Sequence, residues 1–264
     1  MIFALTIIFL IFGLIIGSFL NVVIIRFNTE RSLGGRSGCM TCQNKLVWYE
    51  LIPVLSFLGL RGRCRNCKTK ISIQYPLVEL TTGLIFMALF LKFQDIFFES
   101  AMDFTILYAY YVAMFSLLLV IAVYDLKHKI IPDVLSFTFG FFAFIGLFFF
   151  NGVGFSIHMP SVIEFSAGLL VALPFALFWL VSSGRWMGLG DAKLAIGLGW
   201  LLGFSRAFSG VVVAFWLGAV VGISLVAFSH KKHGMKSEIP FAPFLVLGAL
   251  LAFIFELHLF GVLL

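Results

Sequence analysis

Four cysteines form the first group of residues in this chain that could carry chemistry. They occur as two C-x-x-C pairs, Cys39/Cys42 and Cys64/Cys67, separated by residues 43–63. Two such pairs in one short polar segment are typical of a tetrahedral Zn²⁺ site made of four thiolates. A pair of disulfides is the alternative, and it requires an oxidising compartment. Because four thiolates leave no coordination position open for water, the predicted zinc is structural rather than catalytic.

Carboxylates at the ends of apolar segments form the second group. Ionisable groups are costly at membrane depth and are therefore candidates for function there. Asp125 ends one apolar run, and Asp191 precedes another, directly after Gly188-Leu189-Gly190. Two carboxylates in one partly dehydrated site cannot both ionise cheaply, so one keeps its proton as a general acid while the other takes a proton from water. Asp125 and Asp191 could form such a dyad, as in an aspartic protease. For each residue singly, a helix cap or an exposed ion pair with a nearby lysine is the alternative.

The remaining acids near apolar segments have weaker signals. Asp133 follows Ile131-Pro132, where a helix could start. The positive end of the helix dipole stabilises an acid at that place. Glu79 lies just inside an apolar run and could either reach the membrane surface or contact a catalytic site. Glu164 and Glu256 are expected to meet water. The five histidines show no ligand spacing, so no histidine metal site is predicted.

Composition indicates that these residues belong to a membrane protein. The chain has 264 residues, of which 62% are hydrophobic and 11% charged, whereas about 25% are charged in ordinary soluble domains. This excludes a soluble globular protein. The 34 phenylalanines suit lipid-facing surfaces better than platforms for stacked bases. The net charge of +6 indicates either nucleic-acid binding or the basic bias of cytoplasmic membrane loops.

Eight segments are apolar enough to be membrane-spanning helices, of which the sixth is short. They are residues 2–25, 77–91, 104–124, 134–150, 162–181, 194–204, 207–228 and 241–260. A cleaved signal peptide is the alternative for the first segment, but it would have a basic start and a shorter apolar core. The predicted fold is an all-α polytopic membrane protein of about eight transmembrane helices.

The distribution of lysine and arginine predicts the orientation. Every such residue except Lys92 and Arg206 falls in residues 26–76, 125–133, 182–193 or 229–240. Because cytoplasmic loops carry the basic residues, these segments are predicted to be cytoplasmic and both termini to be outside. Cytoplasmic thiols stay reduced, which favours zinc over disulfides.

This topology divides the chain into three parts. They are a first helix (1–25), a cytoplasmic four-cysteine module resembling a zinc ribbon (26–76), and a membrane bundle (77–264). The arginines of the module suit membrane lipid headgroups, and nucleic-acid binding is not expected. Asp125 and Asp191 both fall at cytoplasmic ends of their helices, which allows them to pair.

Short motifs follow one another in a specific order. They are Gly17-Ser18-Phe19-Leu20-Asn21-Val22-Val23, the two cysteine pairs with Trp48-Tyr49-Glu50-Leu51-Ile52-Pro53 between them, Tyr75-Pro76-Leu77-Val78-Glu79-Leu80, Asp125-Leu126 with Ile131-Pro132-Asp133, Gly188-Leu189-Gly190-Asp191-Ala192-Lys193, and Ile239-Pro240-Phe241-Ala242-Pro243-Phe244. In this order the chain resembles, nearly end to end, the type IV prepilin peptidases, which are membrane aspartic proteases of the GxGD class.

The resemblance implies that Asp125 and Asp191 are the catalytic pair and that Asp133 is a supporting residue. It implies cleavage of prepilin or pseudopilin leaders after a glycine on the cytoplasmic side. It also implies N-methylation of the new amine with S-adenosylmethionine, although the chain has no Rossmann fingerprint and no cofactor-binding residue is predicted. Two alternatives remain open: a cation-coupled transporter, which would have acids in mid-membrane, and a zinc-module scaffold, which would tolerate loss of both aspartates.

Overall fold

The computed structural model describes residues 1–29, 32, 34–35, 37–151, 154–185, 187–228 and 239–259. Contacts divide the chain into two compact units, Met1–Glu99 and Ser100–Leu264. Several residues used to predict the orientation lie outside the described residues, namely Arg31, Arg36, Lys231, Lys232 and Lys236, as does the predicted end of the last span at Phe260.

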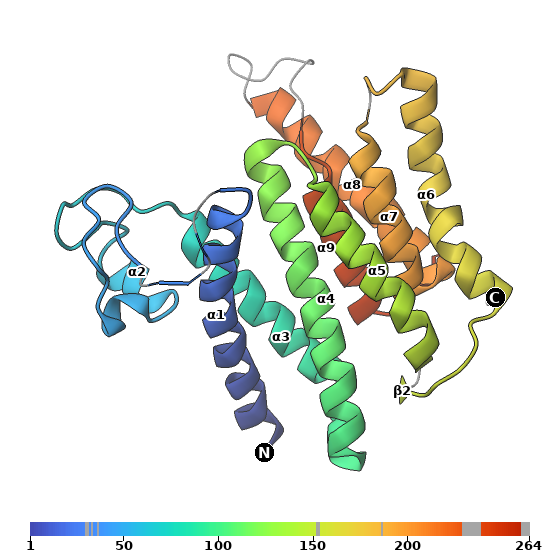
Figure 1. The fold of residues 1–264 in the computed structure, drawn as a ribbon, viewed down its shortest axis with the longest axis horizontal. Coiled ribbons are helices and arrows are strands. Elements are labelled where there is room, and N and C mark those ends of the chain that lie inside the picture. The colour runs from blue at the N-terminus through green and yellow to red at the C-terminus, as the bar shows by residue number, and fades with distance from the viewer. Residues whose placement is uncertain are drawn as a thin grey trace. The chain divides into compact units, whose positions relative to one another are not determined.

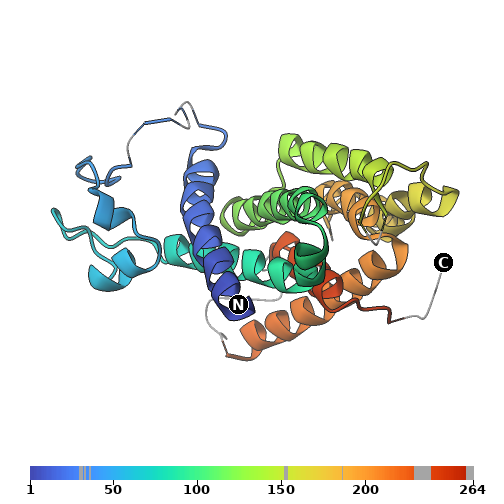
Figure 2. The ribbon, with the colours of Figure 1, turned by 90° about the horizontal axis from the view of Figure 1, so that it is seen from below.

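The first unit is built on two long helices, α1 (Ile2–Arg26) and α3 (Gln74–Glu99), which pack against each other. Figure 2 shows α1 crossing α3. Gly17 permits the close approach, because a Cβ at this position would lie 2.7 Å from the Glu79 Cα. The buried Asn21 amide donates a hydrogen bond to the Tyr75 carbonyl at 3.0 Å. The ends of the two helices that flank the cysteine module are therefore fixed to each other.

The cysteine module between α1 and α3 contains little regular structure. A 3-10 helix, η1 (Trp48–Leu51), and a short helix, α2 (Leu55–Gly59), lie between the two cysteine pairs. Each cysteine pair lies in a turn closed by an isolated β-bridge, Gly38 with Lys45 for the first and Arg63 with Lys70 for the second. The module is the part of the chain for which apolar periodicity gives no helix signal.

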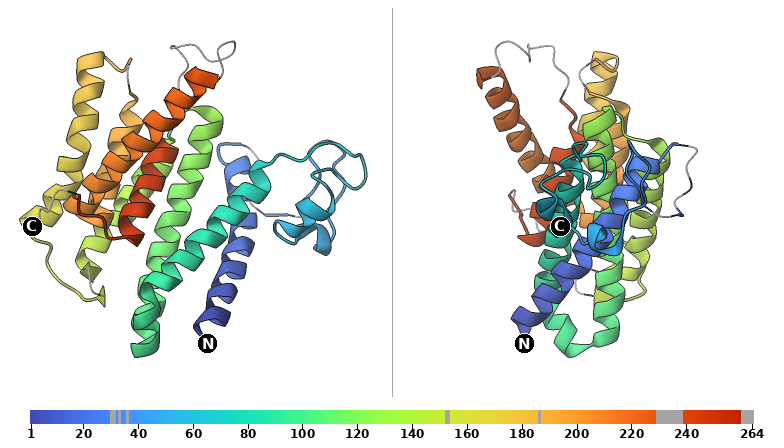
Figure 3. Two further views of the ribbon diagram at one scale, coloured as in Figure 1. Left: turned by 180° about the vertical axis from the view of Figure 1, so that it is seen from behind. Right: turned by 90° about the vertical axis from the view of Figure 1, so that its left-hand side faces the viewer.

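The second unit is a helical bundle. It consists of α4 (Ala101–His128), α5 (Asp133–Phe149), α6 (Val162–Ser182), α7 (Leu189–Leu202), α8 (Phe204–Phe228) and α9 (Ala242–Ile254), with a small hairpin of β1 (Phe150–Asn151) and β2 (Gly154–Phe155) after α5. α7 packs against α5, α6, α8 and α9, and α4 packs against α5 and α9 (Figure 1). The view from behind in Figure 3 shows α8 and α9 side by side.

Local signals account for the helix boundaries of this bundle. The Ser100 hydroxyl accepts a hydrogen bond from the Asp103 amide at the start of α4. Lys129 caps the C-terminus of the helix in a left-handed conformation. Ser161 and Glu164 form a reciprocal capping box at the start of α6. Glu164, expected only to meet water, therefore has a structural role. α5 begins directly after Pro132, as Ile131-Pro132 predicts.

Each of the eight predicted segments contains a helix, which confirms the all-α fold, but the count of eight membrane spans is not confirmed. Within the described residues, five helices, α1, α3, α4, α6 and α8, are long and apolar enough to cross a membrane. α5 and α9 are apolar but shorter, and α7 has only 14 residues. Sequence hydropathy missed the polar first turn of α7, which begins at Leu189 rather than at residue 194.

Candidate active site and metal centre

The two cysteine pairs adopt the same local geometry. In the first, the Cys39 amide donates to the Asn44 carbonyl at 3.0 Å, and the Gln43 amide donates to the Cys39 carbonyl at 2.9 Å. The second repeats these bonds 25 positions later in the chain, from Cys64 to Thr69 at 2.9 Å and from Lys68 to Cys64 at 3.0 Å. The residue after each pair, Gln43 or Lys68, has a positive φ. Each turn therefore presents its two thiols on one side of a tight loop.

All four thiols converge on one point. The Sγ atoms lie within 4.8 Å of one another, with Cys39–Cys67 at 3.7 Å and Cys42–Cys64 at 4.0 Å. Zn–S bonds of about 2.3 Å in a tetrahedron place sulfurs roughly 3.8 Å apart, so the four residues fit a metal ion. None of the four cysteines forms a disulfide. Hydrogen bonding with the Thr69 side chain and amide lowers the pKa of Cys67 to about 6, and backbone hydrogen bonds lower the pKa of Cys39. The pKa of Cys42 is raised, because its hydrogen bond with the Asn44 backbone is outweighed by burial and the neighbouring cysteines. The lowered values favour the thiolate that a metal requires.

Asp125 lies on the last turn of α4, three residues before the helix ends at His128. Its side chain is 5% exposed. The carboxylate Oδ2 accepts a hydrogen bond from the Ala242 amide at 3.2 Å, and Ala242 is the first residue of α9. A helix N-terminus presents unpaired N–H groups and a partial positive charge. The start of α9 therefore stabilises the ionised form of Asp125.

Asp191 lies in the first turn of α7 and is 8% exposed. Its Oδ1 atom has no hydrogen-bond partner among the described residues. Burial and, second, the Asp125 carboxylate raise the pKa of Asp191 to about 7. Because the charge of Asp125 contributes to this shift, the two predicted aspartates lie within range of each other's charge. Their surroundings differ, because Asp125 has an amide donor and this oxygen of Asp191 has none.

The two glycines before Asp191 play different roles. The sequence predicts that both glycines let the backbone closely approach either another helix or an extended peptide. Leu189 and Gly190 are helical. A Cβ on Gly190 would lie 3.0 Å from the Ile131 Cβ, whereas one on Gly188 would meet only the Gly190 amide nitrogen, at 3.9 Å. Gly190 therefore allows α7 to pack on the turn before α5. Only Gly188 leaves space for another backbone.

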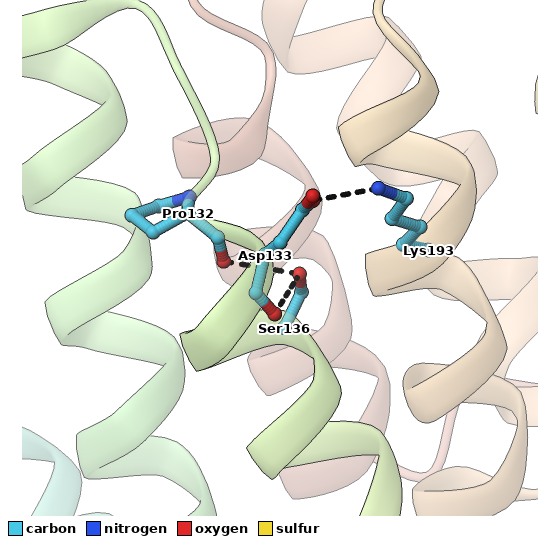
Figure 4. A network of polar contacts seen from close by, with 4 residues as sticks. All are labelled: Pro132, Asp133, Ser136 and Lys193. Atoms are coloured by element: carbon cyan, nitrogen blue, oxygen red, sulfur yellow. Dashed lines mark hydrogen bonds and ion pairs between the residues drawn. The ribbon is translucent and has the colours of Figure 1, made fainter.

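Asp133 and Lys193 form an ion pair near the two aspartates. Lys193 Nζ lies 2.6 Å from Asp133 Oδ1, and the Ser136 hydroxyl donates to the Pro132 and Asp133 carbonyls (Figure 4). Asp133 is the first residue of α5, as a helix-dipole role predicts. The same carboxylate also joins α5 to α7.

Glu79 is buried in the first unit and links α3 to the cysteine module. Its Oε2 atom accepts the Val54 amide at 2.7 Å, and its side chain is 7% exposed. Val54 has a positive φ and precedes α2. Glu79 therefore holds the turn of the cysteine module on α3 rather than extending to the membrane surface.

Sequence reasoning missed the contribution of the Ala242 backbone to the site. The motif Ile239-Pro240-Phe241-Ala242-Pro243-Phe244 carries no ionisable side chain, so residue chemistry assigns it no role. A proline in the first turn of a helix is a start signal, and Pro243 occupies the second position of α9. This signal could have placed a helix N-terminus here, but not beside Asp125.

Comparison with known families accounts for most of the chain. Residues 11–93 match the bacterial peptidase A24 N-terminal domain, and residues 112–223 match the type IV leader peptidase family. Among curated proteins, the chain is 39% identical to the prepilin leader peptidase/N-methyltransferase of Myxococcus xanthus, over 86% of this chain and 64% of that protein. It is 32% identical to the proteins of the same name from Aeromonas hydrophila and Bacillus subtilis, covering 91% and 93% of this chain and 87% and 92% of theirs. The chain belongs to the type IV leader peptidase family.

In this member of the family, the two sites lie in different matched segments. The four cysteines and Glu79 lie within the N-terminal domain match, and Asp125 and Asp191 lie within the leader peptidase match. No solved structure matches the chain. The roles of individual residues therefore follow from the geometry around Asp125 and Asp191.

Proposed function

We propose that this protein is a membrane aspartic endopeptidase that cleaves the leader peptide of type IV prepilins or pseudopilins after glycine, on the cytoplasmic side. Asp125 and Asp191 are its catalytic residues. The observation that carries this assignment is the convergence of two buried carboxylates from α4 and α7. The family and the names of the curated relatives support the reaction and the substrate class.

The different surroundings of the two aspartates divide the catalytic roles. Asp125, which accepts the Ala242 amide at the start of α9, is the ionised base and takes a proton from water. The resulting hydroxide attacks the carbonyl carbon of the glycine. Asp191, buried and protonated, donates its proton to the leaving amine as the C–N bond breaks. The proton that Asp125 has taken from water is then transferred to Asp191, and the pair is ready for another turnover.

The protein also methylates the amine that cleavage exposes. The relatives named prepilin leader peptidase/N-methyltransferase support this second activity. S-adenosylmethionine supplies an electrophilic methyl group for such a reaction. The chain lacks a glycine-rich Rossmann fingerprint, so its cofactor site must be of a different kind.

Cys39, Cys42, Cys64 and Cys67 hold one structural Zn²⁺. The equal geometry of the two turns and the spacing of the four sulfurs support this ion. A four-thiolate site is closed to water, so the metal stabilises the module and takes no part in peptide cleavage.

The protein lies in the bacterial inner membrane. Five long apolar helices and the family support this location. The cysteine module and both aspartates face the cytoplasm in our proposal, because the basic residues of the sequence concentrate there.

Leader release from a purified prepilin tests the function. Asp125→Asn and Asp191→Asn each remove an ionisable group without changing its size, and each is expected to reduce the rate by more than about 10³-fold. The matched control is Asp103→Asn at the other end of α4, outside the proposed site, which is expected to leave the rate unchanged. Wild-type rates in both site variants would exclude the dyad and would favour the scaffold alternative.

The methyl transfer needs a separate measurement. Mature prepilin is incubated with the protein and S-adenosylmethionine, and the mass of its N-terminal peptide is determined. We expect a gain of one methyl group in the wild type and in Asp125→Asn, because a pre-cleaved substrate bypasses the peptidase step. An unchanged mass with the wild type would exclude this activity.

A further inference from the structure

We propose that the Asp133–Lys193 ion pair positions the two catalytic aspartates by fixing the first turn of α7 to the start of α5. This inference depends on the proposed function, in which Asp125 and Asp191 are catalytic. Lys193 follows Asp191 by two residues in the same helix. Its ammonium lies 2.6 Å from the Asp133 carboxylate (Figure 4).

α5 binds the Lys193 ammonium with two side chains. Asp133 supplies the carboxylate, and the Phe137 ring lies one turn later with its centroid 5.4 Å from Nζ. Residues four apart share a helix face, so the two groups act together on one cation by charge and by cation–π attraction. The Lys193 side chain is 25% exposed and the Asp133 side chain 62%, so solvent screens the charge of the pair and the contact acts by fixing the position of the two helices.

The turn between α4 and α5 contacts both helices that carry the aspartates. The Lys129 amide donates to the Asp125 carbonyl at 2.7 Å, and Ile131 lies against Gly190. At the end of the same turn, Asp133 forms the ion pair with Lys193. Alternate residues of one short turn thus set the end of α4 relative to the beginning of α7.

The pair acts through position rather than through charge. Residues two apart on a helix point in different directions, so Lys193 is directed toward α5 and not toward the Asp191 carboxylate. Burial and the Asp125 carboxylate account for the raised pKa of Asp191. Loss of the ion pair should therefore move the aspartates apart without changing the group that titrates.

Steady-state kinetics on full-length protein with a purified prepilin tests the proposal. We expect Asp133→Asn and Lys193→Met each to lower kcat roughly ten- to a hundredfold, because small displacements of catalytic groups reduce rates by such factors. KM should stay within about twofold of the wild-type value. The double variant should be no slower than the slower single variant, because both substitutions break one interaction. Lys193→Arg, which keeps the charge, should recover most of kcat.

Controls separate this role from general instability and from the proposed function. Lys127→Gln removes an exposed lysine near the end of α4 and should leave kcat unchanged, and the melting temperature of every variant is measured. Multiplicative losses in the double variant, or kcat within about twofold of wild type in both single variants, would overturn the positioning role. If Asp125→Asn also releases the leader at the wild-type rate, the proposed function itself fails.

Discussion

The two aspartates of the site differ at the scale of single residues, and this difference has a consequence for pH. Asp191 has a pKa raised to about 7 by burial and by the Asp125 carboxylate. A reaction that needs Asp191 protonated loses its acid as pH rises through that value. Because the two groups interact, the apparent pKa belongs to the pair.

We therefore expect the rate of leader release at saturating prepilin to fall about tenfold per pH unit above pH 7. The measurement is a pH–rate profile from pH 5 to 9 on the protein in detergent, with melting temperatures recorded at each pH. A rate that keeps rising to pH 9 would contradict the protonated state of Asp191.

The two glycines before Asp191 allow a matched pair of substitutions. Gly190→Ala would place its methyl group 3.0 Å from the Ile131 Cβ, so we expect α7 to shift and kcat to fall about tenfold or more. Gly188→Ala meets only the Gly190 amide nitrogen at 3.9 Å, so stability should not change. If the substrate backbone passes Gly188, this variant should raise KM for prepilin instead. Equal effects of both substitutions on kcat and KM would contradict the division of roles.

At the scale of elements, the two cysteine turns are equivalent halves of the candidate metal site. Replacing any of Cys39, Cys42, Cys64 or Cys67 by serine should lower bound zinc from one ion per chain to none, measured by atomic emission. Residues 38–70 should then become sensitive to protease, because structural zinc sites stabilise the segments that they join. Thr41→Ser, inside the first turn but not at a ligand position, is the control. Retained zinc in two single variants would argue against a four-cysteine site.

The sequence predicts elements better than it predicts their contacts. Long apolar runs locate all of the major helices, and the C-x-x-C spacing brings the four thiols together as expected. Hydropathy places the start of α7 at residue 194 rather than at Leu189, because Gly190 and Asp191 have low helix propensity. In the structure, Gly190 packs against Ile131 within the first helical turn. Likewise, Ala242 reaches Asp125 through a backbone amide, and no side-chain pattern encodes such a contact.

At the scale of the whole molecule, the apolar surface indicates which helices face lipid, and the charged residues indicate which side of the membrane each loop faces. Large apolar side chains such as Phe141, Leu173 and Ile223 are exposed on α5, α6 and α8, as expected for helices surrounded by lipid rather than water. The distribution of basic residues in the sequence predicts the orientation of these helices. α7, with 14 residues, is shorter than the apolar helices of the described residues that are long enough to span a membrane.

The location of the C-terminus decides whether α7 crosses the membrane. With eight spans and an N-terminus outside, a reporter fused after Leu264 is outside, and the loop at Gly184 between α6 and α7 is cytoplasmic. If α7 did not cross, every later segment would change sides and the C-terminal reporter would become cytoplasmic. We expect an external C-terminus, because the lysines of residues 229–240 favour the cytoplasm. Alkaline phosphatase and green fluorescent protein fusions, active outside and inside respectively, measure this directly. Fusions at His158, between α5 and α6, should report the outside in either case and therefore serve as the control.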